Sequence, residues 1–279
     1  MTCTGLLREA CNIHDRFALY TVALFYLSVK KGLIVKEKLL KQYQVWDAPT
    51  RVFHWVNFTT VILLIFMGLM MLFKKDMGIT SLDAKITLKT IHILIGYLFV
   101  LNLLVRLIWG FVGNRFARWS NIFPGRDYGA TLKAYIASVK AGEPQQFLGH
   151  NPMGRLAVVV IMGSLIVMAV TGLVRASTDI YYPPFGFAVA EYIAAEGVDP
   201  ATIKPYDKTG TDAEAYAELK AFKDPFGEVH VYTSYFLMFL ILLHIFVVVR
   251  MEVREGGSLV SAMFSGRKAL SKEPEDLNG

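Results

Sequence analysis

The chain contains few charged residues and almost no cysteine. Asp, Glu, Lys and Arg make up 19% of its 279 residues, whereas soluble globular domains contain about a quarter. Its two cysteines, Cys3 and Cys11, leave a disulfide between them open but cannot form a cluster that holds an iron–sulfur centre. The sequence has no C-x-x-C-H, which excludes covalent attachment of a c-type haem.

A basic stripe with interleaved aromatic residues is also missing. The formal net charge is +6, but the Lys and Arg residues cluster beside apolar segments, as they do in membrane proteins. We therefore expect no nucleic-acid partner.

Long apolar runs, in contrast, are abundant, and 54% of the residues are hydrophobic. A helix needs about 20 apolar residues to cross a bilayer, and four segments approach that length. Backbone groups in lipid must be hydrogen-bonded within the segment, so helices are expected. The predicted helices cover about residues 52–73, 90–112, 155–175 and 229–250. The sequence thus predicts an all-α integral membrane protein, a four-helix up-and-down transmembrane bundle in the lipid bilayer.

This transmembrane domain is expected to span residues 45–252, with a long outer insertion at 176–228 between the third and fourth helices. One short helix is expected in the insertion near Asp212–Lys223, with Thr211 as its cap, because Glu214 follows three residues later. Residues 253–279 are expected to form a cytoplasmic tail.

The N-terminal extension, residues 1–44, is of uncertain structure. Its apolar run Phe17–Val29 has 13 residues and is short for a span. A fifth span, an interfacial helix, a signal-peptide core and an upstream translation start stay open. We favour a peripheral extension.

The distribution of basic residues predicts the orientation, because Lys and Arg concentrate in cytoplasmic loops. The segment 175–228 carries five basic and ten acidic residues, so it is expected outside. The Lys-rich loop 74–90 opposes the rule. Six basic residues precede the third helix: Arg115, Arg118, Arg126, Lys133, Lys140 and Arg155. This middle loop and both termini are therefore expected to be cytoplasmic.

Four histidines lie within or beside the apolar segments: His54, His92, His230 and His244. Ionisable residues in a membrane are costly and mark functional sites. His230 and His244 are 14 residues apart, which is close to four helical turns, so they share a face about 21 Å apart. This separation indicates two sites at different depths.

The helix directions then pair the histidines. His54 and His244 lie toward the cytoplasmic side, and His92 and His230 toward the outer side. Each pair can supply both axial ligands of one haem iron, since helix bundles build cofactor sites from facing helices. A buried histidine that only bonds between helices and a zinc site are the alternatives, but zinc prefers about four clustered ligands.

Three further residues lie at the depths expected for two cofactors. Gly68, 14 residues after His54, and Gly96, four residues after His92, leave room beside a flat macrocycle. Arg106, 14 residues after His92, lies at the inner depth. It can pair with a haem propionate or extend to the membrane interface.

His150 and Asn151 precede the third helix on the cytoplasmic side and are candidates for a quinone site. His150 can donate a proton or bond a propionate. The alternative is a loop histidine at the helix entry, with Asn151 and Pro152 forming the cap.

The sequence around these residues resembles the b-type cytochrome subunit of nickel–iron hydrogenases. More broadly, it resembles the bacterial cytochrome b-561 and formate dehydrogenase gamma-subunit superfamily. The matching stretches are VWDAPTRVFHW (45–55), IHILIGY (91–97), RLIWGFVGNRFARW (106–119), GHNPMGR (149–155) and the histidines of 230–244. The resemblance implies two non-covalent bis-histidine b-type haems in a bacterial inner membrane. It also implies electron transfer between a periplasmic redox subunit and the quinone pool.

The acidic segment 198–228 and the extension before residue 42 depart from the hydrogenase subunit pattern. Another dehydrogenase or a periplasmic c-type cytochrome is therefore an alternative partner. A stand-alone haem oxidoreductase acting on a small species is a second function. A haem-free proton-coupled transporter or membrane anchor is a third.

Overall fold

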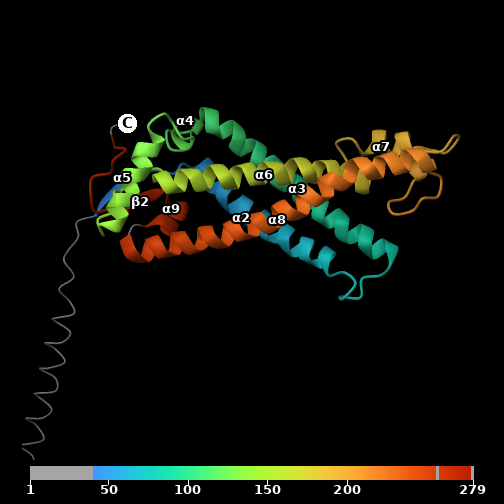
Figure 1. Cartoon of the computed structure of the whole chain (residues 1–279), viewed down its shortest axis with the longest axis horizontal. Coiled ribbons are helices and arrows are strands. Elements are labelled where there is room, and N and C mark those ends of the chain that lie inside the picture. Colours follow the sequence, from blue (N-terminus) through green and yellow to red (C-terminus); the bar gives the residue numbers. More distant parts are fainter. Residues whose placement is uncertain (1–39, 256–257, 278–279) are drawn as a thin grey trace, which may run out of the picture. The chain divides into compact units, whose positions relative to one another are not determined.

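The four apolar segments form four long helices in the computed structural model, which describes residues 40–255 and 258–277. They are α2 (Ala48–Leu72), α3 (Leu82–Val112), α6 (Pro152–Asp179) and α8 (Ala213–Glu255), shown in Figure 1. All four are long and apolar enough to cross a membrane, which confirms the four predicted spans. The predictions for Cys3, Cys11 and the apolar run 17–29 lie outside the described residues.

The chain divides after Lys41 into two units, and the helices belong to the second. Short elements complete it: α4 (Trp119–Ile122), α5 (Tyr128–Lys140), α7 (Gly186–Ile193), the 3-10 helix η1 (Pro200–Thr202) and α9 (Leu259–Ser265). The strands β1 (Lys41–Gln44) and β2 (Arg267–Leu270) pair in a small sheet. Within the described residues the regular structure is therefore helical apart from this small sheet, so the all-α prediction holds in the main.

Polar side chains cap the starts of the long helices, which satisfies otherwise unpaired backbone N–H groups. Asp47 accepts from the backbone of Thr50 at 3.1 Å at the start of α2. Asn151 accepts from the backbone of Gly154 at 2.7 Å at the start of α6, with Pro152 as its first residue. The Asn151–Pro152 cap, which belongs to the alternative interpretation of His150 as a loop histidine, is thus present.

Helix α8 differs most from the expectation. It runs unbroken for 43 residues through Pro225, so the predicted short helix and the fourth span are one helix. The predicted Thr211 cap is wrong, because Asp212 accepts from the backbone of Ala215 at 2.8 Å and the Thr211 hydroxyl donates to the Lys208 carbonyl. At about 1.5 Å per residue, the helix is about twice as long as the hydrocarbon core is thick.

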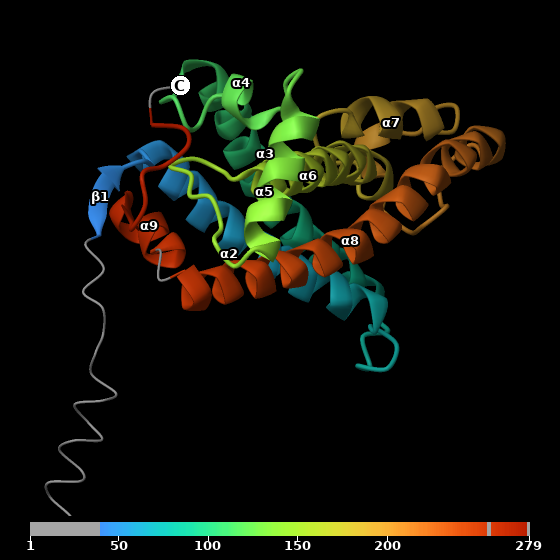
Figure 2. The ribbon, with the colours of Figure 1, turned by 60° about the vertical axis from the view of Figure 1, so that its left-hand side comes forward.

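Helices α2 and α3 pack against each other, as do α6 and α8, and α3 also contacts α6. Helix α7 lies at one end of these long helices and α9 at the other (Figures 1 and 2); we refer to these as the α7 end and the α9 end. At the α9 end, the Trp55 indole donates to the Met263 carbonyl at 3.0 Å.

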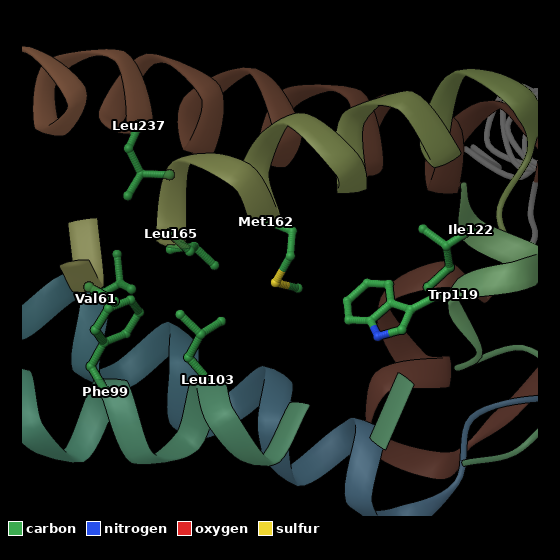
Figure 3. Close-up of a cluster of buried hydrophobic side chains, with 9 residues drawn as sticks. Val61, Phe99, Leu103, Trp119, Ile122, Met162, Leu165 and Leu237 are labelled. Carbon is green, nitrogen blue, oxygen red and sulfur yellow. The ribbon is translucent and has the colours of Figure 1, made fainter. Parts of the chain in front are cut away.

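The core lies between the long helices (Figure 3). Val61 and Phe99 follow His54 and His92 by seven residues, and Leu237 lies seven residues from both His230 and His244. All three are buried in this core. Because seven residues are about two helical turns, the faces that carry the four histidines point toward the interior of the bundle. An apolar layer thus lies between the two histidine levels.

Most of the remaining span surface is exposed and apolar. Only 6% of the most apolar window of α8 is buried, against 28% for α3. A contiguous apolar surface of this kind is typical of a lipid or partner contact, and α8 is the least enclosed of the four spans.

Candidate functional site

His92 on α3 and His230 on α8 face each other near the α7 end. Their ring centroids are 6.4 Å apart and the ring planes meet at 72°. A metal–imidazole bond is about 2 Å long, so two imidazoles on opposite sides of one metal ion place their centroids about 6 Å apart. The observed spacing therefore suits a shared iron.

A hydrogen bond orients the His230 ring. The Thr171 hydroxyl lies 2.8 Å from His230 Nδ1 and donates its single hydrogen to the Val167 carbonyl, at 2.7 Å. In the Nδ1–H tautomer of His230 the hydroxyl oxygen accepts from this group, which leaves the Nε2 lone pair free for a metal. Metal-bound histidines commonly have such a partner on the second nitrogen.

Two glycines lie directly beside the rings. A Cβ atom on Gly172 would lie 3.4 Å from His230 Cε1, and one on Gly68 would lie 4.0 Å from His92 Cε1. A longer side chain at either position would enter the space next to an imidazole. A Cβ on Gly96 would meet nothing within 4 Å. Gly68 and Gly172 thus keep volume open beside the imidazoles, whereas the structure gives Gly96 no contact that supports this role.

His92 Nδ1 is buried and has no hydrogen-bond partner among the described residues. Buried polar atoms are normally paired, so the unpaired Nδ1 is compatible with a ring whose surroundings a bound cofactor completes. The described residues contain no group of three or more His, Cys, Asp or Glu side chains that could hold a metal ion. A pair of imidazoles suits haem better than zinc.

At the second histidine level, toward the α9 end, His54 and His244 do not face each other as closely as His92 and His230 do. His54 on α2 packs edge-on against Trp55 at 5.3 Å, and its Nδ1 is also buried without a partner within residues 40–255 and 258–277. His244 is exposed but lies within electrostatic range of His54. The structure therefore brings His92 and His230 together, whereas it leaves His54 and His244 out of ring contact.

Arg106 is buried, with 5% of its surface exposed, which excludes the extension to the membrane interface. Its guanidinium lies 4.5 Å from the centroid of the Trp119 ring and donates from Nη2 to the Ala117 carbonyl at 3.1 Å. The Nη1 atom is buried and has no partner in the described part of the chain. An anionic group at the second level would satisfy it.

His150 lies beside the entry to α6, where its ring packs 5.0 Å from the Trp46 ring. Burial, followed by the positive charges of Lys268 and Arg106, lowers the pKa of His150 to about 3. The imidazole is therefore neutral at pH 7, so it can offer an N–H group but not a positive charge.

Thr171 and Gly172 were not among the residues expected from the sequence. Gly68 and Gly96 were chosen by their spacing from histidines on their own helices, whereas α6 carries no histidine. The useful signal is depth, because Gly172 lies near the α7 end of the third span, level with His92 and His230.

The chain is similar to known proteins. The family model of prokaryotic cytochrome b561 matches residues 45–266. A probable Ni/Fe-hydrogenase B-type cytochrome subunit of Rhizobium leguminosarum bv. viciae is 23% identical over 247 residues, which cover 83% of this chain and 90% of that protein. A protein of the same description from Azotobacter vinelandii is 25% identical, covering 86% and 95%. The probable Ni/Fe-hydrogenase 1 B-type cytochrome subunit of Escherichia coli K12 is 26% identical, covering 60% and 75%.

Proposed function

The chain belongs to the prokaryotic cytochrome b561 family, and we propose on that basis that it is a dihaem membrane-anchor subunit that passes electrons between a redox partner and the quinone pool. The observation that supports this proposal best is the facing pair His92–His230, with a centroid distance of 6.4 Å. A bound b-type haem supplies one-electron transfer at its iron.

The residues of the chain hold and tune the cofactors in this proposal. His92 and His230 ligate one iron, Thr171 fixes the ring of His230, and Gly68 and Gly172 leave room for the macrocycle. His54 and His244 ligate the second iron. Arg106 offers its unpaired Nη1 to a propionate there.

The α7 end faces the periplasm and the α9 end the cytoplasm of a bacterial inner membrane in this proposal. The outer segment carries ten acidic residues between Arg175 and Glu228, and such a surface accelerates association with a basic partner. The names of the relatives suggest a Ni/Fe-hydrogenase as that partner, and a c-type cytochrome is the alternative. The neutral N–H of His150 is a candidate donor to a quinone carbonyl on the opposite side.

The test is the number of haems in the full-length protein purified in detergent. We expect two b-type haems per chain in the dithionite-reduced minus oxidised spectrum. His92→Ala and His230→Ala each remove the same haem, and His54→Ala and His244→Ala each remove the other, because each iron loses an axial ligand. Phe239→Ala, at a position on α8 that is 59% exposed, is the matched control and keeps both.

Two outcomes contradict the proposal. Absence of haem in a properly assembled protein would favour the proton-coupled transporter or the anchor. A different pairing, in which His92→Ala and His230→Ala remove different haems, would exclude the shared iron.

A further inference from the structure

Three cationic side chains from three helices meet at one carboxylate near the α7 end. Asp179, the last residue of α6, is ion-paired with Lys89 of α3 through Oδ2. Arg175 approaches the same oxygen at 2.6 Å, and Lys223 of α8 approaches Oδ1 at 3.1 Å. The side chain of Asp179 is 4% exposed, that of Lys89 13% and that of Lys223 19%. We call these four residues the Asp179 cluster.

The charges of the Asp179 cluster do not balance. Three cations share one carboxylate, and no other Asp or Glu forms an ion pair with them among the described residues. Tyr181 supplies no negative charge, because burial raises the pKa of its phenol to about 12. The Tyr206 ring lies 5.5 Å from Lys89 Nζ and offsets only part of one charge. Partly buried excess charge of this kind is costly unless anions are bound.

The Asp179 cluster lies beside the His92–His230 pair. Lys89 precedes His92 by three residues and Arg175 follows Gly172 by three, a rise of about 4.5 Å in each helix. Lys223 precedes His230 by seven residues, which is about two turns on nearly the same face. All three cations therefore flank the two imidazoles on one side, toward the α7 end.

We propose that the Asp179 cluster binds the two propionate groups of the haem held by His92 and His230. This inference rests on the proposed function, since it requires a haem at that level. Two propionates and the Asp179 carboxylate supply three negative charges, which match the three cations. The guanidinium of Arg175 has five N–H donors and the lysine ammonium groups have three each, so donors remain after Asp179 is satisfied. Charge-assisted hydrogen bonds to carboxylates are among the strongest in proteins.

The test uses the full-length haem-containing protein with carbon-13 at the haem propionate carboxyls. The variants are Arg175→Met and Lys223→Met, and the control is Lys220→Met, whose lysine lies on α8 and is 66% exposed. Redox-induced infrared difference spectra report the labelled carboxylate bands, and an optical redox titration reports both midpoint potentials. We expect the labelled bands to shift in both variants and not in the control. The midpoint potential of the His92–His230 haem falls, because a cation that disfavours the oxidised iron is lost, while the other haem is unchanged.

Labelled bands that are identical in all three proteins would overturn the inference and leave the Asp179 cluster as an ion-pair network within the protein. If a methionine variant loses the haem, Arg175→Lys or Lys223→Arg replaces it, because each keeps the positive charge and moves the N–H donors. The same infrared measurement applies: shifted labelled bands support the inference, and unchanged bands overturn it. A protein without any haem contradicts the proposed function instead, so the two failures are distinguishable.

Discussion

The single hydroxyl group of Thr171 favours the tautomer of His230 whose Nε2 is available for a metal. It is fixed by its bond to the Val167 carbonyl at 2.7 Å, so its oxygen accepts from His230 Nδ1–H. A hydrogen-bond acceptor on the second imidazole nitrogen increases the basicity of the ligand, which favours ferric over ferrous iron. Thr171 is therefore a positioning residue that acts through His230.

We expect Thr171→Val to raise the midpoint potential of the His92–His230 haem and to weaken retention of that haem by about 10–100-fold. Thr171→Ser keeps the hydroxyl and restores both values. Ser164→Ala is the control, because Ser164 lies on the same helix and its hydroxyl bonds only the Val160 carbonyl. A redox titration and the haem content measure the effect. An unchanged potential in Thr171→Val would show that the hydroxyl does not act on the ligand.

Spacing along one helix predicted the candidate ligands, but contacts between helices could not be predicted in this way. The 14-residue interval and the alternating helix directions led to the His92–His230 pair, whose ring contact the structure contains. Thr171 acts on His230 from 59 positions away, and Lys89 meets Asp179 across 90 positions. Such contacts depend on which helices are neighbours and how each is rotated, and neither is contained in the spacing of one segment.

At the scale of the helices, apolar length and Asn151–Pro152 marked where α6 begins, whereas the continuity of α8 from Ala213 to Glu255 was missed. Pro225 lacks a backbone N–H and disfavours helix at the residue before it, and it lies between the predicted short helix and the predicted fourth span. Tertiary contacts hold the segment of α8 that precedes the proline. Leu219 is buried against Ile193 and Ile203, and Lys223 binds Asp179. These contacts offset the cost of one lost backbone hydrogen bond.

The apolar layer between the two histidine levels supports a prediction about stability. Phe99, with 4% of its surface exposed, packs in the core with Val61 and Leu237. We expect Phe99→Ala to lower the free energy of unfolding by about 3–5 kcal/mol, because the lost contacts leave a cavity between the helices. Phe111→Ala is the matched control on α3, since Phe111 is 75% exposed.

Thermal unfolding of the two variants in the same detergent measures this difference. The haem spectrum should keep both components in each variant below the transition, because neither residue ligates an iron. Equal melting temperatures for Phe99→Ala and Phe111→Ala would contradict the assignment of Phe99 to the core.

On the scale of the whole molecule, charge differs between the two ends of the helices. The α9 end carries the basic segment between α3 and α6, and there the buried Lys268 donates to the carbonyls of Phe147, Leu148 and Gly149 at 2.9, 3.0 and 2.9 Å. At the α7 end, Lys89, Arg175 and Lys223 gather around Asp179, and the segment 175–228 carries ten acidic residues against five basic ones. Because cytoplasmic loops carry an excess of Lys and Arg, the α9 end is expected to be cytoplasmic.

This orientation can be tested with single cysteines in a Cys3→Ser, Cys11→Ser background. Lys75→Cys and Lys204→Cys place an exposed thiol in the α2–α3 loop and beside η1 at the α7 end, and Lys140→Cys and Glu273→Cys place one at the α9 end. We expect a membrane-impermeant maleimide to label the first two in intact spheroplasts and all four after permeabilisation. Labelling of Lys140→Cys and Glu273→Cys in intact spheroplasts would invert the orientation. It would also move the His92–His230 level to the cytoplasmic side, where a periplasmic partner cannot reach it.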